Sequence, residues 1–71
     1  MNFHRVEIIY VNNVPVEIHV DKNNQVCDIF PRIGDALNKY QGRPVTQAVL
    51  DGIKNEMSLT SEILNYKEDY E

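Results

Sequence analysis

The fold predicted for this chain depends mainly on one stretch, RVEIIYVNNVPVEIHV, at residues 5–20. Apolar residues recur at every second position on both sides of Asn12-Asn13, and most of them are β-branched. That pattern is typical of half-buried strands. Because asparagine tolerates a left-handed backbone, the stretch predicts a β-hairpin that turns at these two residues.

The register of the hairpin is predicted from the side chains that it buries. A two-residue loop would place Glu7 opposite Ile18 and Arg5 opposite Val20, which puts charges on the apolar face. A loop of three or five residues instead gathers the apolar residues on one face, namely Val6, Ile8, Tyr10, Val16, Ile18 and Val20. A shift of one residue exchanges the two faces of a strand, so we expect burial to select the odd-numbered loop.

A helix is predicted at about residues 29–40. Asp28 suits its N-cap and Pro31 its first turn. Gly42 suits the left-handed residue after a helix, and Pro44 prevents continuation. One helical face carries residues spaced i, i+3, i+4 and i+7, namely Ile33, Ala36, Leu37 and Tyr40.

Two segments are open to two interpretations each. Residues 26–29 fit either a third short strand or the entry to the helix. Residues 45–57 fit either a strand that ends at Asp51-Gly52 or a helix capped by Thr46. The apolar face of that helix would carry Val49, Ile53 and Met57. Apolar residues after Met57 fall on a different helical face, so we expect the chain to break near Met57-Ser58.

Several short motifs together resemble those of one known family. They are Asp28-Ile29-Phe30 with Ile33 and Leu37, then Gly42-Arg43-Pro44, Val49-Leu50-Asp51-Gly52, and Ser58-Leu59-Thr60-Ser61 with Leu64. Their order is similar to that of the ubiquitin-like β-grasp fold. The resemblance implies a helix across the hairpin, a third strand at residues 49–52, and use as a protein-binding module. It implies neither a conjugated modifier nor a sulfur carrier, because the sequence has no Gly-Gly tail.

The predicted class is α+β, in a single domain of residues 1–71. An amino-terminal β-hairpin packs on the helix at about 29–40, in a β-grasp-like arrangement. The alternative is a two- or three-stranded antiparallel sheet followed by two or three helices. The 71 residues allow one small core. One cysteine forms no internal disulfide, and no apolar run is long enough to cross a bilayer. We therefore expect a cytoplasmic protein without membrane contact.

The charge is uneven along the chain. The net charge of -4 lies wholly in residues 51–71, which hold six acidic residues and two lysines. Direct nucleic-acid binding needs clustered Lys and Arg, and the sequence has no such cluster. We therefore expect no direct contact with nucleic acid. The acidic third of the chain instead fits a protein partner with a basic surface.

The sequence predicts no catalytic, metal-binding or cofactor-binding residues. The nearest histidine to Cys27, the only thiol, is His19, eight positions away, so we expect a buried, inert cysteine. Neither His4 nor His19 has a histidine or cysteine at a metal-ligand spacing. Glycine-rich phosphate-binding motifs are absent from the sequence. We expect no enzyme.

The expected function is a non-enzymatic protein–protein interaction module, an adaptor or an inhibitor-like accessory factor. Tyrosine is common at binding hot spots, and the acidic third carries two. The candidate partner-binding residues are Leu59, Glu62, Ile63, Tyr66, Glu68, Asp69 and Tyr70. One alternative is a structural subunit of a homo-oligomer, built through a sheet edge or the second apolar stripe. Another is an acidic decoy of a nucleic-acid-binding protein.

Overall fold

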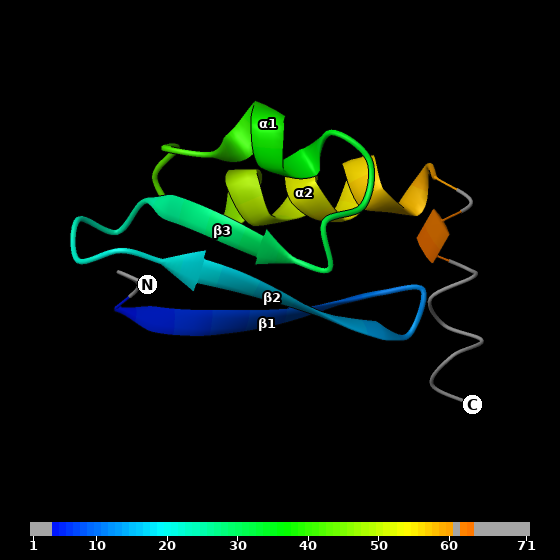
Figure 1. The fold of residues 1–71 in the computed structure, drawn as a ribbon, viewed down its shortest axis with the longest axis horizontal. Helices are drawn as coiled ribbons and strands as arrows, with labels where there is room; N and C mark the ends of the chain where they lie inside the picture. Colours follow the sequence, from blue (N-terminus) through cyan, green and yellow to red (C-terminus); the bar gives the residue numbers. More distant parts are fainter. Residues whose placement is uncertain (1–3, 61, 64–71) are drawn as a thin grey trace.

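The computed structural model describes residues 4–60, 62 and 63. Its elements follow the order β1 (Arg5–Val11), β2 (Val14–Val20), β3 (Val26–Phe30), α1 (Ala36–Tyr40) and α2 (Gln47–Ser58). The strands form one antiparallel sheet in the order β1-β2-β3. Both helices lie on the same side of this sheet (Figure 1). The class is therefore α+β, in the form of the alternative: a three-stranded antiparallel sheet followed by two helices.

The hairpin closes with a two-residue loop, so the prediction of a three- or five-residue loop is wrong. Val11 lies opposite Val14, and Glu7 lies opposite Ile18. Asn12 and Asn13 have φ angles of 51° and 69°, the left-handed backbone that a two-residue hairpin turn requires. This turn matches the twist of the flanking strands, and asparagine adopts it readily. Local turn chemistry therefore sets the register.

The two charges on the helix side of β1 are tolerated because they stay near solvent. The side chains of Arg5 and Glu7 are 40% and 41% exposed. Arg5 Nε donates to Glu7 Oε2 at 2.9 Å, and Arg5 Nη2 donates to Asn24 Oδ1 at 2.7 Å. The burial penalty that disfavoured this register in the sequence argument is therefore small, since both groups are paired and partly hydrated.

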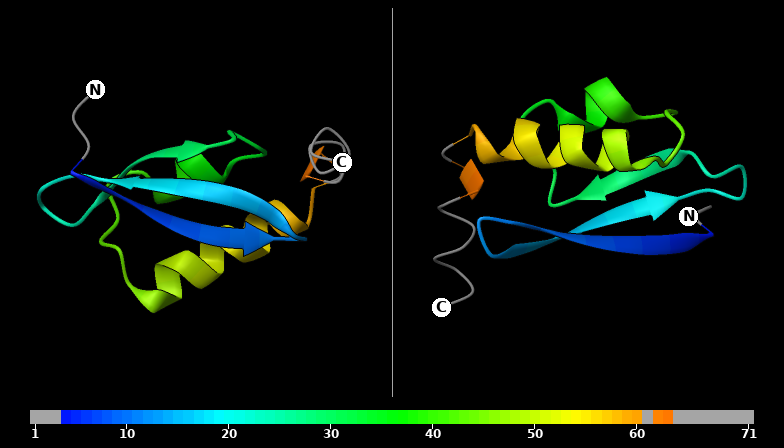
Figure 2. Two further views of the ribbon diagram at one scale, coloured as in Figure 1. Left: turned by 90° about the horizontal axis from the view of Figure 1, so that it is seen from below. Right: turned by 180° about the vertical axis from the view of Figure 1, so that it is seen from behind.

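The opposite face of the sheet carries exposed apolar side chains. Figure 2 shows this face from below, with the strands in front of the helices. Its large exposed residues are Val6 at 36%, Ile8 at 49%, Tyr10 at 61% and Phe30 at 51% exposure. The expectation that Val6 and Ile8 point into the core is wrong, because the two-residue loop turns the even positions of β1 outward. Ile18 is buried as expected.

Helix α1 is shorter than the predicted helix at 29–40. Residues 26–30 form β3, which confirms the third-strand interpretation of that segment. The carboxylate of Asp28 accepts a hydrogen bond from the backbone N–H of Ile29 and caps no helix. Gly34 has a φ of 63°, a left-handed backbone that interrupts an α-helix, so α1 begins only at Ala36. Gly42, with a φ of 83°, follows α1 as predicted.

Residues 47–58 form α2, which decides between the two interpretations of residues 45–57. The third strand that the β-grasp resemblance implies at residues 49–52 is therefore helical. Thr46 caps α2, and its Oγ1 accepts a hydrogen bond from the Val49 N–H at 3.2 Å. Ile53 and Met57 are fully buried on the predicted face. The helix ends at Ser58, which confirms the expected break.

The core lies between the sheet and the two helices. Its buried apolar residues are Val11, Val14, Val16, Ile18, Val20, Val26, Ile29, Ile33, Ala36, Ile53, Met57 and Ile63. In the part of the chain that the structure describes, no helix is both long and apolar enough to span a membrane.

Candidate functional site

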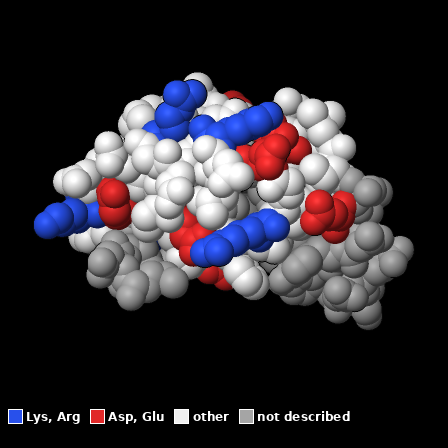
Figure 3. All heavy atoms as spheres, turned by 45° about the horizontal axis from the view of Figure 1, so that its top comes forward, with Lys and Arg blue, Asp and Glu red and all other residues white. Residues whose placement is uncertain are grey.

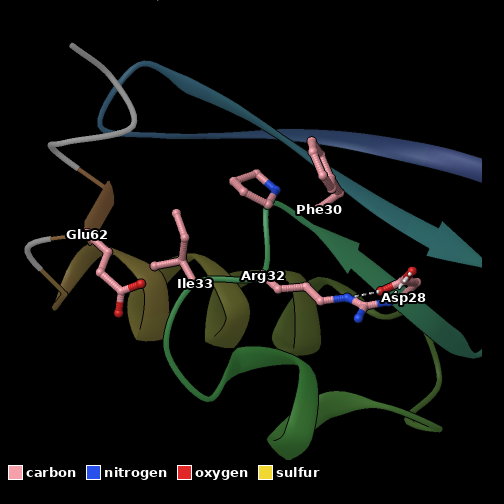
Figure 4. A pocket seen from close by; sticks show the side chains of 6 residues that line it. Asp28, Phe30, Arg32, Ile33 and Glu62 are labelled. Atoms are coloured by element: carbon pink, nitrogen blue, oxygen red, sulfur yellow. Dashed lines mark hydrogen bonds and ion pairs between the residues drawn. The ribbon is translucent and has the colours of Figure 1, made fainter. Parts of the chain in front are cut away.

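A groove of about 590 Å³ lies where β3 leads into the loop before α1 (Figure 4). It is lined by Asp28, Phe30, Pro31, Arg32, Ile33 and Glu62. Its apolar surface is mainly the half-exposed Phe30 ring, because Pro31 and Ile33 are buried. In Figure 4, Glu62 lies at one end of the groove and Asp28 at the other. The groove is therefore an apolar surface between charged ends.

The charge at the Asp28 end is largely neutralised. Arg32 Nε and Nη2 donate to the two carboxylate oxygens of Asp28 at 3.1 Å and 3.0 Å. These hydrogen bonds from Arg32, followed by the one from the Ile29 N–H and the positive charge of Arg32, hold the pKa of Asp28 below its ordinary value. Because Asp28 and Arg32 cancel each other, Glu62 contributes the net charge of the groove lining.

The depressed pKa of Asp28 predicts a loss of stability in acid. A carboxylate whose folded pKa lies below its unfolded value of about 3.9 stabilises the fold above that pH. The contribution disappears as the pH falls through the folded pKa. In Arg32→Gln, we expect the pKa of Asp28, measured by NMR titration, to rise towards its ordinary value. The midpoint of acid unfolding should rise with it. An unchanged Asp28 titration in this variant would show that Arg32 does not set the pKa.

The binding residues predicted from the sequence differ in exposure and position in the structure. Leu59 is 76% exposed, and Glu62 is exposed and lines the groove. Ile63 is fully buried in the core, where a partner does not reach its side chain. The remaining four, Tyr66, Glu68, Asp69 and Tyr70, lie outside the described residues.

The apolar part of the groove was not predicted as a site. Sequence reasoning assigned Phe30, Pro31 and Ile33 to the helix at about 29–40. The alternative of a strand at residues 26–29 could have revealed this site. A proline directly after a strand starts a turn more readily than it continues the sheet. With that choice, Phe30 ends a strand at the sheet edge and its ring is free to face solvent.

Cys27 is partly buried beside the backbone of β2. Its Sγ donates a hydrogen bond to the carbonyl oxygen of His19 at 3.3 Å. Ile29 lies opposite Ile18, because the strand pairing has a bulge at His19 and Val20. Burial, followed by the negative charges of Asp21 and Asp28, raises the pKa of the Cys27 thiol. That direction is opposite to the one that a catalytic thiolate needs.

The described residues show no metal site and, on the face drawn in Figure 3, no concentrated charge. On the face drawn in Figure 3, Lys and Arg lie among Asp and Glu, and neither sign forms a continuous patch. Lys39 Nζ, for example, lies 2.8 Å from Glu56 Oε1. Within residues 4–60, 62 and 63, no three His, Cys, Asp or Glu side chains are arranged to hold a metal ion.

Comparison of the chain with known protein families, with curated proteins and with solved structures gives no match.

Proposed function

We propose that this chain is a non-enzymatic protein–protein interaction module, an adaptor or an inhibitor-like accessory factor, that binds a basic segment of another protein. The observation that supports this proposal is the groove beside the half-exposed Phe30, closed at one end by Glu62. Exposed aromatic rings beside an apolar groove are common anchors of protein interfaces.

The chemistry of the groove favours one kind of occupant. The Phe30 ring suits an aliphatic or aromatic side chain, and the volume of about 590 Å³ suits a short peptide segment. The Glu62 carboxylate suits a neighbouring lysine or arginine, while Asp28 and Arg32 already satisfy each other. The net charge of -4 would also steer a basic partner towards the protein.

The carboxyl-terminal residues extend the same proposal. Tyr66, Glu68, Asp69 and Tyr70 follow Ile63 in the sequence by three to seven positions. Ile63 is anchored in the core directly after the groove residue Glu62. These four residues, together with the exposed Leu59, remain candidate contacts, because tyrosine and acidic side chains suit a basic partner.

The raised pKa of the Cys27 thiol supports the non-enzymatic part of the proposal, because the thiolate is the reactive form. The single cysteine also suits a reducing compartment, and we include a cytoplasmic location in the proposal.

Selection from a random peptide library tests this function. We expect the enriched peptides to combine a large apolar residue with a neighbouring lysine or arginine. Phe30→Ser should weaken their binding about tenfold or more, as for loss of a hot-spot side chain. Glu62→Lys should remove the preference for basic residues, and binding to the unaltered chain should weaken as salt rises.

Two matched variants serve as controls. Asp35→Lys changes the net charge as Glu62→Lys does, but Asp35 does not line the groove. Tyr10→Ser removes an exposed aromatic ring from outside the groove. Tyr10→Ser should bind like the unaltered chain, and Asp35→Lys should keep the preference for basic residues that Glu62→Lys removes. Enriched peptides without basic residues, or binding that Phe30→Ser leaves unchanged, would reject the groove as the contact surface.

A further inference from the structure

Strand β1 is the open edge of the sheet in the part of the chain that the structure describes. It pairs with β2 on one side only. The outer side of β3 is different, because the segment after α1 lies against it. The Val26 N–H donates to the Arg43 carbonyl oxygen at 2.9 Å, and the Gly42 N–H donates to the Val26 carbonyl oxygen at 2.7 Å. The outer side of β3 is thus covered at its Val26 end, whereas no segment of the described residues pairs with the outer side of β1.

The two-residue turn determines which backbone groups face that open edge. In such a hairpin, the residues that flank the turn, here Val11 and Val14, form a hydrogen-bonded pair. Bonded and non-bonded pairs alternate along an antiparallel ladder. The backbone N–H and C=O groups of Val6, Ile8 and Tyr10 therefore point away from β2. The strand has no proline, lysine or bulge, and its two charged residues on the helix side, Arg5 and Glu7, are paired with each other.

We propose that β1 pairs antiparallel with β1 of a second copy of this chain, about a twofold axis at Ile8. The pairing joins the two three-stranded sheets into one continuous sheet. Ile8 then lies opposite Ile8 of the second copy, and Val6 lies opposite Tyr10. These are apolar cross-strand pairs of the kind that stabilise sheets, and they join the two exposed faces.

The other registers are less favourable. An axis at Glu7 places the two Glu7 carboxylates directly opposite each other, and facing like charges destabilise a strand pair. Moving the axis towards either end of β1 leaves part of the strand without a partner. The axis at Ile8 pairs all seven residues of β1, Arg5–Val11, and opposes no two like charges.

A second groove lies beside the end of β1 that this register pairs. It has a volume of about 280 Å³ and lies between the end of β1 and α2, lined by Val11, Asn12, Asp51, Lys54, Asn55 and Ser58. In the proposed pair, Arg5 of the second copy lies opposite Val11 on the helix side of the sheet, at the mouth of the groove that holds both Asp51 and Lys54. The twofold axis repeats this arrangement at the other end of the paired strands. Asp51 and Lys54 offset each other and Arg5 is paired with Glu7, so the register is carried by the strand pairing and not by charge.

Sedimentation of the full chain from micromolar to millimolar concentration tests the proposal. We expect a reversible monomer–dimer equilibrium. Ile8→Pro removes the outward N–H at the axis, a substitution that edge strands tolerate, and should raise the dissociation constant about tenfold or more. Ile8→Thr keeps the N–H and should have a smaller effect. A monomer at every concentration, or equal effects of the two variants, would overturn edge pairing.

Cysteine crosslinking tests the register independently, and it needs no proline in the strand. In a Cys27→Ser background, Ile8→Cys should give a disulfide-linked dimer on mild oxidation. Hydrogen-bonded antiparallel pairs have Cα atoms about 5.5 Å apart, within the range that a disulfide spans. Val6→Cys in the same background should not crosslink, because Val6 lies opposite Tyr10. Efficient crosslinking through Val6 and not through Ile8 would overturn the proposed axis.

Discussion

Replacing Ile18 by alanine should lower the free energy of unfolding by about 2–5 kcal/mol, the usual loss for a large aliphatic side chain in a core. Ile18 is fully buried at the centre of the sheet, opposite Glu7 of β1 and Ile29 of β3. A domain of this length is stable by only about 4–10 kcal/mol. The loss is therefore a large share of the total, and urea denaturation followed by circular dichroism measures it.

Ile8→Ala is the matched control, because it deletes the same atoms from a side chain that is 49% exposed. We expect a loss below about 1 kcal/mol. Both variants should be measured at low protein concentration, so that self-association does not add to stability. Similar losses for the two variants would indicate the odd-numbered loop, which buries Ile8 together with Ile18.

Replacing both turn asparagines by valine should lower the free energy of unfolding by about 2–4 kcal/mol. Asn12 and Asn13 both have positive φ angles, and a left-handed backbone costs an ordinary L-residue about 1–2 kcal/mol. Valine lacks the local polar contacts of asparagine, and its branched Cβ is crowded in this conformation. Thermal and urea unfolding of the double variant measure the effect.

Asn13→Gly is the control for the turn. Glycine adopts positive φ without steric cost, and Asn-Gly is a preferred pair in two-residue hairpin turns. We expect equal or greater stability. A double valine variant as stable as the unaltered chain would show that the turn does not hold the hairpin in its register.

The sequence by itself determined the elements whose signals are local. The alternation on both sides of Asn12-Asn13 predicted the two strands of the hairpin, and Gly42 predicted the left-handed exit from α1. Thr46 with the Val49, Ile53 and Met57 spacing described α2, although the same residues also fitted a strand. Each of these signals depends only on residues close together in the sequence, in one turn or on one helix or strand face. The sequence is therefore enough to predict such elements.

Only the tertiary structure decided whether charge is tolerated on the helix side of β1, the choice of strand at residues 26–30 and the groove beside Phe30. Each depends on which parts of the sheet the helices cover. The prediction of an odd-numbered loop assumed that the helix side of β1 is wholly buried. In the structure, Arg5 and Glu7 on that side are 40% and 41% exposed and pair with each other. Partial exposure removes most of the penalty for a charge on that face, and the energetic preference of the Asn-Asn turn then prevails.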